Sequence, residues 1–264
     1  MIPIPTRILR LARYMWLRWR QGKGLAGRNR RQGVLSNSLM AAETVDFERE
    51  CERLIQEIER DARETVHFFG TARFDAAVLA AIAKVPREAF VPAAARPFAY
   101  INRPLAIGHG QTISQPYIVA AMTHMLALTP AARVLEIGAG CGYQAAVLAE
   151  IAAEVVTVET IPALAEAAAE RLARLGYDNV QVHVGDGWKG WAEAAPYDAI
   201  IVTAAAAEMP AELVAQLAPG GRMAIPLGRP YETQRLVLVA KDAEGNLTES
   251  VNLPVAFVPL VKGD

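Results

Sequence analysis

The 264-residue chain is predicted to form an α/β fold around a mostly parallel sheet of about seven strands, with helices on both faces and a helical addition at its N-terminus. Apolar runs alternate with helical stretches from residue 131 onward, a glycine-rich turn follows the first run, and helical periodicity precedes them. Hydrophobic residues make up 53% of the chain and charged residues 21%, which is typical of a folded protein and excludes a disordered one.

The first predicted elements are helices. Residues 43–62 contain few helix breakers, and a second helix over 75–84 should end before Val85-Pro86, because proline disfavours helix in the preceding residue. The proline-rich stretch 86–116 is predicted to be rich in loops. Pro116 should begin a helix that continues over 117–126.

Strands and helices alternate in the rest of the chain. We predict strands at 133–137, 154–159, 180–184 and 198–203, helices at 143–152, 161–175 and 210–217, and then strands at 222–226, 236–240 and 251–260. The turn Glu244-Gly245-Asn246 makes the last two strands a predicted hairpin. We therefore expect a basic extension (1–42), a helical and loop region (43–116) and a sheet domain (117–264), with 43–264 forming one compact unit.

Charge is distributed unevenly. Residues 1–39 carry nine Lys and Arg and no acidic residue, whereas the rest holds 18 basic against 28 acidic residues, which disfavours a nucleic-acid groove. No apolar run approaches 18 residues, so we expect no transmembrane helix. Three interpretations of the basic segment remain open: a disordered or loosely helical arm, a misplaced start with Met40 as the first residue, and contact with membrane or nucleic acid. Two cysteines make no disulfide framework, and a cytoplasmic location fits.

The strongest local signal is the sequence Val134-Leu135-Glu136-Ile137-Gly138-Ala139-Gly140-Cys141-Gly142, in which a buried strand leads into three glycines. Glycine lets a ligand approach the backbone because no Cβ blocks it. The spacing differs from the Gly-x-Gly-x-x-Gly of dinucleotide-binding proteins. With Glu136 in front, it resembles the first motif of Rossmann-like methyltransferases, which implies that Glu136, Gly138, Gly140 and Gly142 bind S-adenosylmethionine. The alternative is a plain strand-to-helix turn.

Acidic residues follow the next two predicted strands. Glu159 lies 21 residues after Gly138, where a carboxylate can accept hydrogen bonds from both ribose hydroxyls of a nucleoside. Asp186-Gly187 comes after the third strand, where Asp186 could accept from an adenine amine. Each has a simpler interpretation, a surface or capping glutamate and a common turn pair. Thr203-Ala204-Ala205 ends the fourth strand and lacks the Asn/Asp-Pro-Pro-aromatic sequence of many nitrogen methyltransferases.

A polar, glycine-punctuated segment precedes the sheet domain, and with its neighbours it resembles the protein-L-isoaspartate O-methyltransferase family over roughly residues 70–261. The string Gly-Gln-Thr-Ile-Ser-Gln-Pro is the most specific part of this likeness. The segments that carry it are Val85–Pro92, Tyr100, Gly108–Pro116, Leu135–Gln144, Gly185–Gly187, Ala195–Asp198 and Phe257–Leu260. Departures are small: Ala139 and Cys141 stand where the family often has Thr and Ser, and Ala106 where proline is usual.

The resemblance implies a role for each matching residue. Ser114 matches the active-site serine, Gln111, Thr112 and Ile113 border the cofactor, and Glu159, Asp186 and Gly187 bind it. Gln234, before the penultimate strand, is a further candidate for cofactor contact. The implied activity is transfer of a methyl group from S-adenosylmethionine to the free α-carboxylate of L-isoaspartyl residues in damaged proteins, with D-aspartyl residues as a further class, which initiates repair through a succinimide.

An α-carboxyl group has a pKa of about 3.3–3.7 and is ionised at pH 7, so no general base is expected. We therefore expect Ser114 to orient the carboxylate rather than to attack it. The four histidines do not pair with Cys or carboxylates at metal-ligand spacing, and we expect no metal. Isoaspartyl proteins are the expected partners of a monomer without obligate nucleic acid. Methylation of another carboxylate, an NAD-dependent oxidoreductase and an RNA-binding module are the alternatives.

Overall fold

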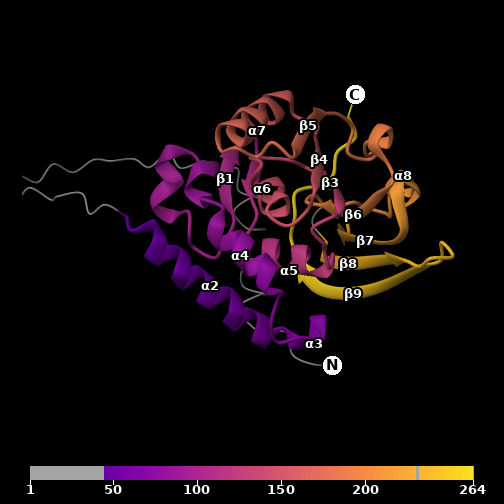
Figure 1. Ribbon diagram of the computed structural model, residues 1–264, viewed down its shortest axis with the longest axis horizontal. Coiled ribbons are helices and arrows are strands. Elements are labelled where there is room, and N and C mark those ends of the chain that lie inside the picture. Colours follow the sequence, from indigo (N-terminus) through magenta and orange to yellow (C-terminus); the bar gives the residue numbers. More distant parts are fainter. Residues whose placement is uncertain (1–44, 230–231, 264) are drawn as a thin grey trace, which may run out of the picture.

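The computed structural model describes residues 45–229 and 232–263 (Figure 1). The predicted basic extension, 1–42, lies outside these residues. Helix α2 (Phe47–Glu64) begins at Asp46, whose side chain accepts a hydrogen bond from the backbone N–H of Arg49, as expected of an N-cap. Short α3 (Val66–Phe69) follows, and α4 (Ala76–Lys84) ends before Pro86 as predicted.

The central sheet has seven strands, as the alternating pattern predicted. In spatial order β5-β4-β3-β6-β7-β8-β9, the first five strands are parallel, β8 is antiparallel to β7, and β9 is antiparallel to β8. The strands are β3 (Arg133–Ile137), β4 (Glu154–Glu159), β5 (Val180–Val184), β6 (Tyr197–Val202), β7 (Leu217–Leu227), β8 (Gln234–Lys241) and β9 (Leu247–Val255). The bounds of β3, β4 and β5 are those predicted, because parallel strands buried on both faces read as continuous apolar runs.

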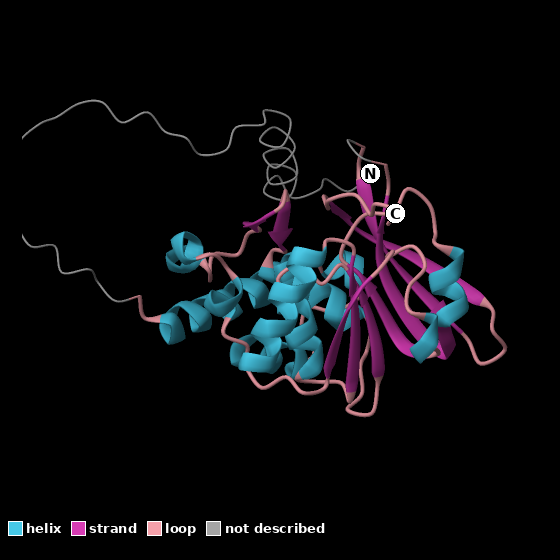
Figure 2. Ribbon diagram, turned by 90° about the horizontal axis from the view of Figure 1, so that it is seen from above, coloured by secondary structure: helices cyan, strands magenta, loops and turns pink. Residues whose placement is uncertain are grey.

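Helices cover both faces of this sheet (Figure 2). The remaining helices are α5 (Pro116–Met125), α6 (Tyr143–Ala149), α7 (Pro162–Arg174) and α8 (Ala211–Gln216). Pro116 is the first residue of α5, as predicted. α6 stops three residues short of its predicted end. None of the helices that the structure describes is long and apolar enough to cross a membrane.

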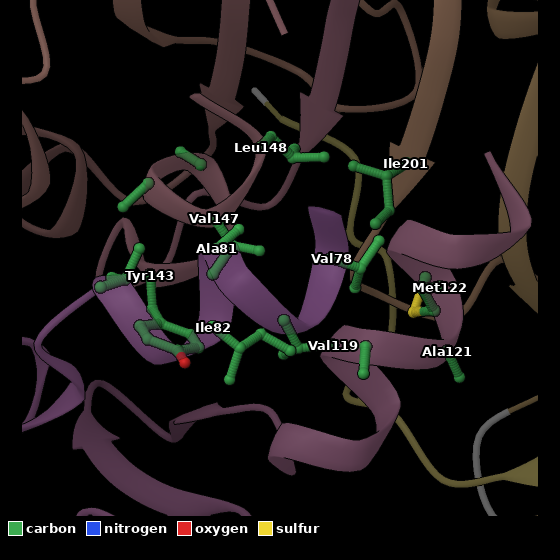
Figure 3. Packing of buried hydrophobic residues seen from close by; sticks show 14 of the residues in the cluster. Val78, Ala81, Ile82, Val119, Ala121, Met122, Tyr143, Val147, Leu148 and Ile201 are labelled. Carbon is green, nitrogen blue, oxygen red and sulfur yellow. The ribbon is translucent and has the colours of Figure 1, made fainter. Parts of the chain in front are cut away.

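One hydrophobic cluster joins the N-terminal helices to the sheet. It contains Ile58 of α2, Ile82 of α4, Val119 of α5 and Val134 of β3. Figure 3 shows side chains of α4, α5 and α6 in this cluster, among them Ile82, Val119 and Tyr143. A second cluster fills the other face, where Leu213 of α8 is buried. The helical region thus shares its core with the sheet, although the predicted boundary at residue 116 stays a prediction.

The loop-rich stretch 86–116 also contains short regular elements. These are the 3₁₀ turns η1 (Arg87–Phe90) and η2 (Ala93–Phe98) and an antiparallel hairpin of β1 (Leu105–Gly108) and β2 (Gln111–Ile113). Strands this short and polar show no clear alternation of apolar and polar residues, so the sequence does not mark them. The last strand ends at Val255 rather than at residue 260.

Residues 256–263 leave the sheet and run beside the segment that follows β6. The N–H of Ala205 donates to the carbonyl of Val258 at 2.8 Å, and the N–H of Leu260 donates to the carbonyl of Ala205 at 2.8 Å. This C-terminal segment therefore lies at the carboxyl edge of the parallel strands, where the predicted site residues also lie.

The shared core leads to a prediction about the free energy of unfolding of the protein. Ile58 is fully buried in α2, so Ile58→Ala should lower the free energy of unfolding by about 2–5 kcal/mol, through lost apolar contact and the cavity left behind. Exposed Gln56→Ala in the same helix is the matched control. Denaturant unfolding of the whole chain should show one transition shifted by Ile58→Ala. A change of less than about 1 kcal/mol would mean that α2 is not part of the stabilising core.

Candidate active site

The candidate site lies at the carboxyl edge of the sheet, where the chain reverses its direction of strand addition. β3 lies between β4 and β6, and the chain adds β4 and β5 on one side before β6 on the other. The loops after such neighbouring strands separate and leave a crevice, which is where open α/β sheets bind ligands. The glycine loop after β3, Glu159 at the end of β4 and Asp186 after β5 all come to this edge.

The glycine loop has a backbone that only glycine adopts readily. Gly138, Gly140 and Gly142 have φ of 95°, 54° and 86°, all in the left-handed region. A Cβ on Gly138 would lie 2.5 Å from Oγ1 of Thr203, at the end of β6. That hydroxyl itself lies 3.0 and 2.8 Å from the carbonyl oxygens of Ile137 and Gly138. Thr203 therefore holds the start of the loop from the neighbouring strand.

Glu159 holds the same loop from the other side. Its carboxylate is 6% exposed. One oxygen accepts the N–H of Gly140 at 2.8 Å, and the other accepts the N–H of Ile161 at 3.0 Å. Each carboxylate oxygen can accept a further hydrogen bond. The residue can therefore fix the glycine loop and still receive ribose hydroxyls.

Glu136 is the least satisfied side chain of the site. It is fully buried, and neither carboxyl oxygen has a hydrogen-bond partner. Burial raises its pKa to about 8, and the nearby Glu159 charge adds to the rise. The nearby Thr157 hydroxyl acts in the opposite direction and lowers the pKa of Glu136, although its oxygen makes no hydrogen bond to a described residue. A buried acceptor without a partner is costly, so it suits a site that a ligand donor completes.

These residues fit S-adenosylmethionine. The left-handed glycines allow close approach to the backbone, Glu159 offers acceptors for hydroxyls, and Glu136 offers an orphaned acceptor. Among the residues that the structure describes, no three His, Cys, Asp or Glu side chains converge to hold a metal ion.

The loop after β5 is shaped by packing. One Asp186 oxygen accepts the N–H of Trp188 at 2.9 Å, and the other lies 3.9 Å from Nζ of Lys189. A Cβ on Gly187 would lie 2.6 Å from Ile137 and 3.0 Å from Leu260 of the C-terminal segment. Gly187 is therefore needed for close packing of this loop, whatever it contributes to binding.

Gln234 is engaged with the C-terminal segment. It is buried at the start of β8, its Nε2 donates to the carbonyl of Phe257 at 3.0 Å, and its Oε1 accepts the N–H of Phe257. Both ends of the amide thus hold the chain that leads to Leu260. Its contact with the cofactor stays a prediction.

The hairpin β1–β2 packs on the glycine loop and leads directly into Ser114. Cδ1 of Ile107 in β1 would lie 3.4 Å from a Cβ on Gly140, so the hairpin packs on that loop. Ser114 follows β2 directly; it is partly buried, and its hydroxyl makes no hydrogen bond to another described residue. Its carbonyl accepts Nη2 of Arg87 at 2.6 Å. Within β2, Thr112 is exposed and Ile113 buried, while Gln111 Nε2 lies 3.5 Å from the carbonyl of His109.

Sequence reasoning missed three contributors to this geometry. Thr203 has no local sequence pattern that marks it as a threonine holding a glycine loop across the sheet. Ile107 contacts that loop only because residues 105–113 form a hairpin. Arg87 lies in one of the segments that carry the family resemblance, but its burial could not be read from a stretch rich in proline.

The glycine loop gives a direct test of the cofactor site. Gly138→Ala should weaken binding of S-adenosylhomocysteine at least about 30-fold, because it adds left-handed strain of about 1–2 kcal/mol to a clash with Thr203. Gly176→Ala is the matched control: its φ is 82°, but nothing lies within 4 Å of a Cβ there. Calorimetric titration measures both. Equal affinities of the two variants for S-adenosylhomocysteine would mean that the glycine loop is not part of the binding site.

The raised pKa of Glu136 leads to a prediction of how the stability of the cofactor-free protein depends on pH. Its pKa is raised on folding, so its contribution is fully present below its unfolded pKa near 4.5 and is lost as pH rises through about 8. Between pH 5 and 8 the wild type should lose stability relative to Glu136→Gln, by at most about 4 kcal/mol. Among the neighbouring titratable groups, the Glu159 charge raises the pKa of Glu136, while burial, with the Glu136 charge as a smaller cause, raises the pKa of the Cys141 thiol.

Denaturant unfolding at several pH values measures this difference. Glu166→Gln, an exposed position on α7, is the control for the change of side chain. If the wild type and Glu136→Gln lose stability in parallel, Glu136 does not take up its proton in the folded state.

Comparison with known proteins agrees with this arrangement. Residues 69–264 match the family model described as protein-L-isoaspartate(D-aspartate) O-methyltransferase. The chain is 56% identical over 211 residues to protein-L-isoaspartate O-methyltransferase 2 of Syntrophobacter fumaroxidans, covering 80% of this chain and 85% of the relative. It is 54% identical over 207 residues to the enzyme of the same name in a Polaromonas species, covering 78% and 98%.

Two solved structures show the same fold. A protein-L-isoaspartate O-methyltransferase superposes with a TM-score of 0.68 at 29% identity, over 79% of this chain and 65% of the other. A Plasmodium falciparum structure described as a β-aspartate methyltransferase in complex with S-adenosyl-L-homocysteine gives a TM-score of 0.67 at 25% identity, over 83% and 100%. The chain belongs to the protein-L-isoaspartate(D-aspartate) O-methyltransferase family.

Proposed function

We propose that Ser114 orients the free α-carboxylate of an L-isoaspartyl residue against S-adenosylmethionine bound in the crevice at the carboxyl edge of β3, β4 and β5. As a member of its family, the protein is an S-adenosylmethionine-dependent methyltransferase that acts in the repair of isoaspartyl damage. The observation that carries the proposal is a partly buried Ser114 hydroxyl that donates to no described residue, on a hairpin packed against the glycine loop.

The substrate carboxylate needs orientation more than activation. An α-carboxyl group is ionised at pH 7, since its pKa is about 3.3–3.7. Bound S-adenosylmethionine supplies a methyl group on a sulfonium, which is already a good leaving group. The task left to the protein is alignment at near-attack distance, with water excluded. A neutral hydroxyl donates one hydrogen bond to the carboxylate without neutralising its charge as a bound cation would.

The cofactor would be held by the residues gathered at the sheet edge. Glu159 would receive the ribose hydroxyls, Asp186 and Gly187 would border the adenine, and Gly138, Gly140 and Gly142 would let the methionine part approach the backbone. Gln111, Thr112 and Ile113 of β2 would border it from the hairpin side. Support comes from the position of these residues at one edge and from the unpartnered Glu136 carboxyl behind the loop.

The proposal also covers the substrates, the oligomeric state and the location of the protein. The substrates would be damaged proteins and peptides with L-isoaspartyl residues, with D-aspartyl residues as a further class, and the protein would work as a cytoplasmic monomer without nucleic acid. The alternative is methylation of another carboxylate in the same crevice. The family to which the chain belongs favours the first.

Ser114→Ala tests the assignment. Removing the hydroxyl should lower kcat for an isoaspartyl peptide about 10²- to 10³-fold, which is typical of losing one positioned donor, and should leave the dissociation constant of S-adenosylhomocysteine unchanged. Ser250→Ala, at an exposed position of β9, is the matched control. Full turnover by Ser114→Ala would reject the proposed role. A fall in cofactor affinity without a change in kcat would place Ser114 in the cofactor site instead.

A further inference from the structure

Arg87 is a cation buried in the core of the protein. Its side chain is fully buried, and no carboxylate of a described residue lies within ion-pair distance. Burial lowers its pKa from the usual arginine value, and Tyr143 is the largest influence in the opposite direction. Buried charges are normally paired, because removing a cation from water costs several kcal/mol. An unpaired guanidinium in this core therefore needs an explanation.

Carbonyl oxygens take the place of a carboxylate. Nε donates to the carbonyl of Ala99 at 2.9 Å, and Nη2 donates to the carbonyl of Ser114 at 2.6 Å. Nη1 has no partner. A charge-assisted hydrogen bond is shorter and stronger than a neutral one. The side chain thus binds the backbone of Ser114 itself, immediately behind the hydroxyl assigned to the substrate.

The guanidinium is in turn held by aromatic rings that reach the glycine loop. Cζ of Arg87 lies 4.6 Å from the ring centroid of Tyr143, the first residue of α6. Tyr143 meets Phe90 edge-on at 5.5 Å, and Cζ of Arg171 lies 5.9 Å from the Phe90 ring. Nη1 of Arg171 donates to the carbonyl of Cys141 in the glycine loop at 2.9 Å.

The contacts form one series between the two loops of the site. One arginine holds the carbonyl of Ser114, the other holds the carbonyl of Cys141, and Tyr143 and Phe90 lie between the arginines. Stacking of a guanidinium on an aromatic ring restricts its orientation. The position of Ser114 is therefore tied to the position of the glycine loop by buried, directional contacts.

We infer that Arg87 is a positioning residue for methyl transfer: through the Ser114 carbonyl it sets where the Ser114 hydroxyl lies, and its charge attracts the substrate carboxylate from behind the backbone without contacting it. This inference rests on the proposed role of Ser114. A cation in a medium of low dielectric constant acts over a longer range than one in water. A direct ion pair would weaken the nucleophile, whereas a cation screened by a peptide group leaves its oxygens free.

Arg87→Lys separates positioning from folding. The substitution keeps the charge but cannot span two carbonyls in a fixed fork. It should lower kcat for an isoaspartyl peptide about 10- to 100-fold, as a displacement near 1 Å can do, and should leave the dissociation constant of S-adenosylhomocysteine within about twofold. Arg133→Lys is the matched control, because Arg133 pairs with Glu154 at the amino ends of the strands, away from the crevice.

A double-mutant cycle identifies the residue through which Arg87 acts. In a Ser114→Ala background, Arg87→Lys should cause no further loss of kcat, since the hydroxyl that it positions is already gone. If the double variant instead loses kcat by the product of the two single losses, Arg87 does not act through Ser114 and the inference is overturned. The single Ser114→Ala variant judges the role of Ser114 on its own, so failure of that role is distinguished from failure of this inference.

Arg87→Met is the second variant, because an apolar isostere of a buried charge is often tolerated in folding. It removes both the hydrogen bonds and the charge, so kcat should fall at least as far as in Arg87→Lys, and KM for the peptide should rise as well. Unchanged kcat in either folded variant would overturn the inference. Failure of both variants to bind S-adenosylhomocysteine would also overturn it, because Arg87 would then be a requirement of the fold alone.

Discussion

The left-handed glycine loop between two strand ends is the constraint on which the rest of the site depends. Thr203, directly after β6, holds the loop at Gly138, and Glu159 at the end of β4 holds it at Gly140. Because β4 and β6 flank β3 in the parallel sheet, these contacts fix the loop relative to the sheet rather than to one neighbour. A loop fixed from both sides can present a backbone surface that is ready before the ligand binds, which lowers the ordering cost of binding.

Charge is arranged differently on the two sides of the crevice. The acidic residues Glu136, Glu159 and Asp186 lie where the cofactor is proposed to bind, whereas the proposed substrate side has the neutral Ser114 hydroxyl in front and the buried Arg87 behind. Methyl transfer from a sulfonium to a carboxylate removes one positive and one negative charge. A site that orients both charges without pairing either tightly avoids stabilising the reactants more than the transition state.

Strand bounds and site residues differ in how far the sequence predicts them. β3, β4 and β5 are predicted to the residue, and the glycine loop, Glu159 and Asp186 follow from their places after those strands, because local pattern and topology agree. The hairpin β1–β2 could not be predicted, since its strands gain stability by packing Ile107 on Gly140, a contact across the chain. Three other features likewise depend on tertiary contacts that no local sequence pattern marks. They are the burial of Arg87, the hydrogen bonds of the Thr203 hydroxyl, and the hydrogen bonds between the Gln234 amide and Phe257.

The most direct test of the account is methyl transfer from radiolabelled S-adenosylmethionine to two peptides that differ only in an L-isoaspartyl or a normal aspartyl linkage. The account predicts base-labile label on the isoaspartyl peptide alone, because a methyl ester forms only on the free α-carboxylate that the hairpin presents to the crevice. Equal labelling of both peptides, or binding of S-adenosylmethionine with label on neither, would contradict the substrate assignment and leave only the cofactor site standing.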